Sequence, residues 1–168
     1  MQLYLVRHAI AFDRDPVQWP DDRDRPLTPD GKKRFRQAAR GLDEIVQPPD
    51  LVLSSRFARA WATAEMLVKE ADWPEPDVCE SLESGHTPAD VLHALVPRTG
   101  VDSVALVGHE PGLTELAAFL LLGAESAVPF LLKKGGVLGI TFPGGSPVAG
   151  AGRLEWLLTP RVLRRLSD

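Results

Sequence analysis

An arginine and a histidine stand side by side where the first apolar segment of the chain ends, in the run Leu-Tyr-Leu-Val-Arg-His-Ala from residue 3. The apolar part suits a buried strand, and ligands of open α/β sheets bind just beyond the carboxyl ends of the strands. A neutral imidazole is a good nucleophile near neutral pH, because its unperturbed pKa is about 6.5. The pair therefore predicts a site where His8 attacks a phosphoryl group beside the fixed cation of Arg7.

Three further segments carry side chains that could complete this site. Arg25 lies in Arg-Pro-Leu-Thr, Arg59 follows a Ser-Ser pair at the start of a helical pattern, and His109 follows an apolar run. Catalysis of phosphoryl transfer is mostly positioning plus electrostatic stabilisation of the charged oxygens. Arginine suits this work because its planar fork bonds two oxygens at once and stays charged. We therefore expect a cradle of three arginines and one histidine, with no metal and no cofactor.

These motifs resemble the histidine phosphatase superfamily, also called the phosphoglycerate mutase-like family, and within it the short phosphohistidine phosphatases of the SixA type. The resemblance covers nearly the whole chain, because the four motifs stand in the family's order. It implies that His8 is the nucleophile and that Arg7, Arg25, Arg59 and His109 surround the phosphate. It also implies a metal-independent hydrolase whose phosphohistidine intermediate is hydrolysed by water, which divides one displacement into two steps.

Two positions depart from the superfamily's pattern. Ala9 stands where many members have glycine, which is tolerated unless the backbone needs a positive φ. The carboxylate that phosphomonoesterases use to protonate the leaving oxygen has Glu83 as its candidate, with Glu80 and Asp13 behind it. An imidazole leaving from a P–N bond needs less help than an alkoxide. Because SixA-like sequences have no clear carboxylate motif at this point, the resemblance favours a P–N substrate over a P–O substrate.

Three functions stay open from the sequence. The preferred function is removal of phosphate from phosphohistidine on a signalling protein, such as a histidine phosphotransfer domain, because the chain has no long insertion that could cover a small metabolite. The alternative on the same fold is a phosphomonoesterase acting on a small phosphorylated metabolite. The third is a catalytically inactive phospho-binding module, against which the intact His8 argues.

The composition limits the compartment and the partners. With 168 residues, 44% of them hydrophobic and 25% charged, we expect one domain over residues 1–168. A net charge of -4 argues against broad nucleic-acid binding, and no apolar run reaches the ~20 residues that a membrane helix needs. The chain has a single cysteine, Cys79, so it cannot form an intrachain disulfide, and we expect a cytoplasmic protein. Cys79 itself is expected to be a buried core residue.

The other ionisable residues have simpler interpretations. His86 and His93 are expected to be structural or exposed, because a metal site built from them with His8 and His109 would have neither paired i, i+4 histidines nor cysteines. A basic cluster is interpreted as the solvated face of a helix, with docking to an acidic protein as the weaker alternative. This cluster consists of Lys32, Lys33, Arg34, Arg36 and Arg40.

Alternating strands and helices predict the scaffold. Apolar strand-like runs at 3–6, 51–53 and 104–107 are each followed by a helical pattern, while 137–142 and 153–158 form a closing hairpin. This alternation implies a mostly parallel sheet with helices on both faces, hence a three-layer α/β/α fold with at least one antiparallel strand. The first helix is expected to start at Thr28-Pro29, to keep Ile45 inward and to end at Pro48-Pro49. The stretches 12–28 and 72–86 are expected to be irregular.

Overall fold

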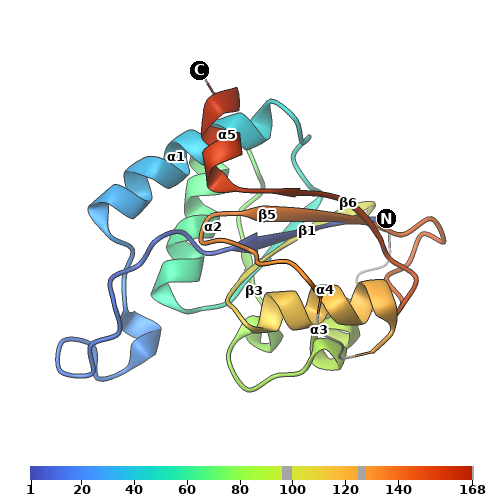
Figure 1. The fold of residues 1–168 in the computed structure, drawn as a ribbon, viewed down its shortest axis with the longest axis horizontal. Coiled ribbons are helices and arrows are strands. Elements are labelled where there is room, and N and C mark those ends of the chain that lie inside the picture. Colours follow the sequence, from blue (N-terminus) through green and yellow to red (C-terminus); the bar gives the residue numbers. More distant parts are fainter. Residues whose placement is uncertain (96–99, 125–127, 168) are drawn as a thin grey trace.

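The computed structural model describes residues 1–95, 100–124 and 128–167. In these residues a six-stranded sheet lies between two layers of helices (Figure 1). The strands are β1 (Gln2–Arg7), β2 (Leu51–Ser54), β3 (Asp77–Val78), β4 (Ser103–Gly108), β5 (Val137–Thr141) and β6 (Arg153–Leu158). The helices are α1 (Pro29–Asp43), α2 (Ala58–Ala71), α3 (Pro88–Leu95), α4 (Gly112–Leu122) and α5 (Pro160–Leu166), with the one-turn helices η1 (Asp22–Asp24) and η2 (Glu80–Leu82).

The sheet is mostly parallel, and its strand order is β3-β2-β4-β1-β5-β6. Strands β3, β2, β4 and β1 pair in parallel, whereas β5 pairs antiparallel with both β1 and β6. This topology confirms the predicted α/β fold and its closing hairpin. Because the parallel strands run in the same direction, their carboxyl ends meet at one edge, and the Arg-His pair lies there.

Alternation along the central strands supplies both cores. Leu3 and Leu5 of β1 pack on the side of α3 and α4, while Tyr4 and Val6 pack on the side of α1, α2 and α5. In Figure 1, α3 and α4 lie below the sheet, and α1 and α5 lie above it. Parallel strands buried on both faces have continuous apolar sequences. That is why β1 and β4 could be recognised as short apolar runs.

Helix α1 begins as predicted and brings its first turn close to the site. The Thr28 Oγ1 accepts a hydrogen bond from the N–H of Gly31 at 2.9 Å, which caps the helix, and Pro29 occupies the first helical position. A Cβ at Gly31 would lie 2.1 Å from the carbonyl oxygen of Ile10. Only glycine therefore lets the start of α1 pack against the chain that follows His8.

The predicted end of α1 is wrong. The helix ends at Asp43 rather than at the proline pair, and Ile45 is 46% exposed. The chain turns after Asp43, because the N–H groups of both Ile45 and Val46 bond the carbonyl of Leu42. This turn buries Val46 and leaves its neighbour outside.

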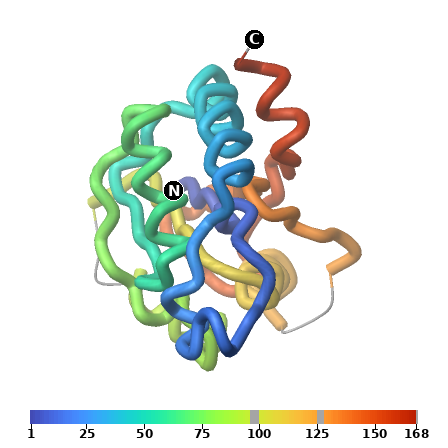
Figure 2. Tube along the Cα trace, turned by 90° about the vertical axis from the view of Figure 1, so that its left-hand side faces the viewer, coloured from blue at the N-terminus to red at the C-terminus, as the bar shows by residue number. Residues whose placement is uncertain are grey.

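Helices α1 and α5 lie side by side, as Figure 2 shows at the top of the view. A Cβ at Gly41 of α1 would come within 1.8 Å of the carbonyl oxygen of Leu163 in α5. The small residue therefore allows the two backbones to approach closely. This contact packs the last turn of α1 against α5.

The stretches expected to be irregular contain short elements. Strand β3 and helix η2 lie within 72–86, η1 lies within 12–28, and an isolated bridge joins Leu27 of that stretch to Ala11. Cys79 is buried in the core, as predicted. No helix in the described part of the chain combines the length and the apolar character needed to cross a membrane.

Candidate active site

The sheet register brings His8 and His109 together. Arg7, the last residue of β1, pairs with Gly108, the last residue of β4, and the N–H of His8 donates to the Gly108 carbonyl at 3.0 Å. Each histidine is therefore the first residue beyond its strand. Their ring centroids lie 5.2 Å apart, and both side chains are buried.

The hydrogen bond of the His8 ring fixes its tautomer. Its Nδ1 lies 2.7 Å from the carbonyl oxygen of Ala9. Because a carbonyl can only accept, Nδ1 carries the ring proton and Nε2 keeps a free lone pair. Among the described residues other than glycine, Asp72 alone has a positive φ, so the alanine at position 9 introduces no backbone strain.

Thr63 joins the His8 segment to helix α2, and the sequence interpretation did not single it out. Its Oγ1 accepts a hydrogen bond from the N–H of Ala9 at 3.0 Å and donates to the carbonyl of Arg59 at 2.6 Å. One buried hydroxyl thus holds the backbone after the nucleophile against the turn that carries Arg59. The signal was present in the sequence, because Thr63 lies four residues, about one helical turn, after Arg59.

Arg59 and Arg25 meet on a carboxylate that the sequence analysis missed. The buried Arg59 donates from Nη1 to the backbone oxygen of Asp22 at 2.7 Å, and its Nη2 lies 3.0 Å from Asp22 Oδ2. Arg25 bonds the other carboxylate oxygen through Nε at 2.7 Å. The Arg25 hydrogen bond and the charge of Arg59 lower the pKa of Asp22, which stays ionised. The five acidic residues between 13 and 24 gave no basis for selecting this one.

An aromatic ring and a serine orient His109. The Ser55 Oγ accepts the N–H of Phe57 at 3.2 Å and lies 2.9 Å from Nε2 of His109. If the Ser55 hydroxyl donates its proton to Nε2 of His109, then Nε2 is the unprotonated nitrogen of the ring. The proton of the neutral imidazole is then on Nδ1. The Phe57 ring lies 4.9 Å from the imidazole and 5.0 Å from the Arg59 guanidinium carbon, so it contacts both side chains.

Unpaired polar atoms concentrate at this point. In the described part of the chain, four buried side-chain nitrogens have no hydrogen-bond partner. Three of them belong to the site: Nε of Arg7, Nε of Arg59 and Nδ1 of His109. A buried unpaired donor is costly, so such atoms in a folded protein call for an explanation. An oxyanion bound between them would supply the missing acceptors.

Comparison with known proteins agrees with this geometry. The family model described as histidine phosphatase superfamily (branch 1) matches residues 3–84. An uncharacterized protein of Picosynechococcus sp. (strain ATCC 27264 / PCC 7002 / PR-6) is 32% identical over 161 residues, spanning 92% of this chain and 89% of its own. The solved structure of the protein histidine phosphatase SixA complexed with tungstate is 27% identical and has a TM-score of 0.80, with 97% of this chain and 99% of that chain covered. The chain belongs to the histidine phosphatase superfamily.

A second solved structure, of an Agrobacterium tumefaciens protein assigned as phosphohistidine phosphatase SixA, is 25% identical with a TM-score of 0.76 and covers 95% of this chain and 97% of that one. This histidine phosphatase is accordingly a hydrolase with no metal requirement. The described residues contain no group of three or more His, Cys, Asp or Glu side chains that could hold a metal ion. His86 and His93 are exposed, and His86 Nδ1 lies 3.9 Å from Asp90 Oδ2.

The acid candidates lie at the border of the histidine phosphatase site or outside it. Glu83 lines a small cavity together with His109, and its Oε1 accepts the backbone N–H of Arg56 at 3.3 Å. Glu80 is exposed and lies 3.5 Å from the Arg56 guanidinium, and Asp13 is exposed as well. Of the three carboxylates, the structure brings only Glu83 next to a site residue.

Burial keeps both histidines neutral in the free enzyme. Desolvation, reinforced by the charges of Arg59 and Arg7, lowers the pKa of His8 to about 3, although its bond to the Ala9 carbonyl opposes the shift. Desolvation followed by the charge of Arg59 lowers the pKa of His109 to about 2. At neutral pH the site therefore contains an unprotonated nitrogen on His8 and fixed positive charge on the arginines.

These pKa values predict a pH-dependent stability. The unfolded chain, with histidine pKa values near 6.5, binds protons that the folded site excludes, so the free energy of unfolding should fall as the pH drops from 6.5 toward 3. Between pH 7 and pH 5 we expect a loss on the order of 1–2 kcal/mol per histidine. Urea unfolding at several pH values measures this slope. His8→Asn should flatten the slope and exposed His93→Asn should not, whereas equal slopes in all three proteins would contradict the assignment.

Proposed function

We propose that this histidine phosphatase removes phosphate from phosphohistidine on a protein and forms a phosphohistidine on His8 during turnover. In this proposal Arg7, Arg59 and His109 bind the phosphoryl oxygens, and Arg25 supports Arg59 through Asp22. The unpaired nitrogens of the first three residues support this assignment, because they are aimed at no acceptor among the described residues. The likeness to SixA, a protein histidine phosphatase, supports the substrate class.

In the first step Nε2 of His8 attacks phosphorus, and the P–N bond to the substrate imidazole breaks. The electron pair of that bond goes to the substrate nitrogen, and protonation of the other substrate ring nitrogen from water lets the ring leave as neutral imidazole. The Nδ1 proton of His8 stays hydrogen-bonded to the Ala9 carbonyl, which stabilises the phosphorylated imidazolium. The guanidinium groups compensate the negative charge on the oxygens.

In the second step a water molecule attacks the same phosphorus from the vacated side. The new O–P bond forms as the bond between phosphorus and Nε2 breaks, and its electron pair returns to His8. The proton released from water leaves with the phosphate or passes to solvent. The enzyme regains a neutral imidazole, in agreement with the lowered pKa of His8.

The observation that carries the P–N preference is the state of the nearby carboxyl groups. Asp22 is held ionised between two arginines, and Glu83 accepts a backbone N–H. Asp22 therefore has no proton to donate to a leaving alkoxide, and Glu83 is bonded to the backbone of Arg56. A general acid contributes about 10²–10⁴-fold to such reactions. A site of this kind suits a leaving group that needs little protonation, and it supports a role in signalling by protein phosphohistidine.

The test compares P–N and P–O substrates in buffer containing EDTA. Wild-type protein should hydrolyse a phosphohistidine peptide much faster than a panel of alkyl phosphates. Glu83→Gln should reduce the rate on the peptide less than about threefold, and Glu65→Gln, an exposed change on α2, serves as the control. If Glu83 acts as the acid for the residual hydrolysis of alkyl phosphates, Glu83→Gln should lose more than about tenfold in the rate on these esters.

The ratio of the two losses is the observable, because damage to folding would lower both rates together. An equal, large loss on both substrates would make Glu83 a true general acid and favour the phosphomonoesterase. Activity that disappears with EDTA and returns with a divalent ion would contradict the metal-free mechanism.

A further inference from the structure

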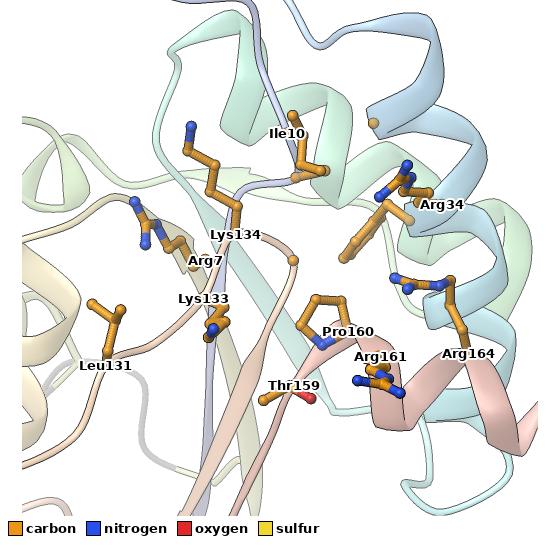
Figure 3. A pocket seen from close by; sticks show the side chains of 14 residues that line it. Arg7, Ile10, Arg34, Leu131, Lys133, Lys134, Thr159, Pro160, Arg161 and Arg164 are labelled. Carbon is orange, nitrogen blue, oxygen red and sulfur yellow. The ribbon is translucent and has the colours of Figure 1, made fainter.

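A cationic groove adjoins the proposed phosphate site and shares Arg7 with it. Its volume is about 470 Å³, and four segments line it: the end of β1, the start of α1, residues 131–135 and the start of α5 (Figure 3). The packing of α1 against α5 forms one of its ends. A volume of this size admits several side chains of a partner or one small ligand.

The lining is strongly positive in a protein of net charge -4. Six of its fourteen residues are cationic, and none is acidic. These cations are Arg7, Arg34, Lys133, Lys134, Arg161 and Arg164. Among the described residues, only Arg34 of this set has a carboxylate within ion-pair distance, namely Asp30 at 2.7 Å. Clefts lined by one sign of charge raise the local concentration of oppositely charged partners.

The groove is continuous with the nucleophile. The N–H of Gly135 lies 3.0 Å from the carbonyl oxygens of both Arg7 and His8, and Arg7 Nη1 donates to the Leu132 carbonyl at 2.7 Å. The loop that carries Lys133 and Lys134 is thus bonded directly to the backbone of the Arg-His pair. The groove is therefore close enough to His8 for one substrate molecule to occupy both places.

The arrangement of the cations distinguishes between possible ligands. Figure 3 shows Arg7, Lys133 and Lys134 toward one end and Arg34, Arg161 and Arg164 toward the other, with Pro160 between them. The cations are dispersed along the groove, whereas a second phosphate group would need donors that converge on one point. Apolar surface lies among them, including Leu131, which is 64% exposed. Dispersed cations around apolar surface match a protein segment with several carboxylates and an apolar contact.

We propose that this groove binds an acidic segment of the protein whose phosphohistidine is hydrolysed, so that it selects substrates by the charge around the phosphorylated residue. The proposal rests on the protein phosphohistidine phosphatase function proposed above. It also assigns Arg34 a role different from that of its helix neighbours Lys32 and Lys33, which do not line the groove.

The test uses two phosphohistidine peptides of equal length, one with glutamates and one with glutamines around the phosphorylated residue. The groove variant is Arg34→Gln/Arg161→Gln/Arg164→Gln. The matched control, Lys32→Gln/Lys33→Gln/Arg165→Gln, also removes three positive charges from α1 and α5, and its residues are exposed and do not line the groove. None of these six residues belongs to the proposed phosphate cradle.

Wild type should show a higher kcat/KM on the acidic peptide, and the preference should shrink as salt increases. An exposed ion pair contributes about a twofold change, so three lost contacts predict about an eightfold loss on the acidic peptide. The groove variant should lose this preference and keep its rate on the neutral peptide, while the control should behave as wild type. Equal rates of wild type on both peptides, or an equal loss in control and groove variant, would overturn the proposal.

A binding measurement separates this proposal from the proposed function. Fluorescence anisotropy with the unphosphorylated acidic peptide should give tighter binding to wild type than to the groove variant, regardless of any turnover. If neither phosphohistidine peptide is hydrolysed while phosphate esters are, the substrate assignment fails, and the anisotropy still tests the groove. Identical anisotropy for wild type and groove variant would remove the docking role even if the phosphatase assignment stands.

Discussion

Replacing His8 by Ala is expected to abolish turnover, with a loss of at least about a thousandfold in kcat, because it removes the atom that forms the covalent bond. Brief incubation of wild type with a labelled substrate should leave label on His8. A phosphorylated imidazole loses its label in acid and keeps it in alkali, which distinguishes it from a phosphoserine. Rapid quenching followed by peptide mapping measures both the site and the stability of the bond.

The control for this experiment is another histidine of the same chain. His93→Ala on the exposed face of α3 should keep full turnover and full labelling. Thermal unfolding of His8→Ala shows whether the buried site still folds. A folded His8→Ala protein with near wild-type turnover would refute the nucleophile assignment, and label found elsewhere would redirect it.

Arg59→Ala should weaken inhibition by inorganic phosphate or vanadate and reduce kcat by orders of magnitude. Loss of a hydrogen bond to a charged group costs about 1.5–3 kcal/mol in ordinary binding, so about ten- to hundredfold in the inhibition constant, and more in a transition state. Arg59→Lys keeps the charge but not the planar fork, and we expect an intermediate effect. Inhibition constants and kcat for the three proteins check this order.

Arg59 also holds Asp22, so an indirect effect must be separated from a direct one. Asp22→Ala removes the same ion pair from its other side. If it reproduces the whole loss of Arg59→Ala, the arginine acts through the η1 segment and does not contact phosphate. Arg40→Ala, an exposed arginine paired with Glu70 on the surface, controls for the change of residue type and should have no effect.

The sequence predicted those parts of the fold whose signal is local. Strands β1 and β4 are continuous apolar runs because both of their faces are buried, and the Thr28 cap followed by proline marks the start of α1. His8 and His109 could be selected because each directly follows such a strand. The end of α1 could not be predicted from the helical pattern, which included Ile45. The chain leaves the helix before Ile45 and buries Val46 in the core, and this depends on tertiary packing.

The missed site residues depend on contacts between distant segments. Asp22 matters because the chain after β1 returns to helix α2, and nothing within 13–24 indicates which carboxylate meets Arg59. Arg34 differs from Lys33 only because α5 and the loop before β5 lie opposite it. The tertiary structure is required to tell which carboxylate meets Arg59 and which basic residue of α1 lines the groove. Residue type and spacing were sufficient to select the arginines of the cradle.

The spacing of the two histidines is a property of the backbone ladder. Their rings are 5.2 Å apart, close to the roughly 4.8 Å that separates any two hydrogen-bonded strands, because both residues leave adjacent strands at the same level of the register. Side chains in the two cores can therefore change during evolution, with consequences for stability, while the distance between the rings is preserved. The distance between the rings thus depends on strand pairing and not on the identity of the core side chains. This agrees with a chain that shares only 27% of its residues with SixA and still superposes on it over almost its full length.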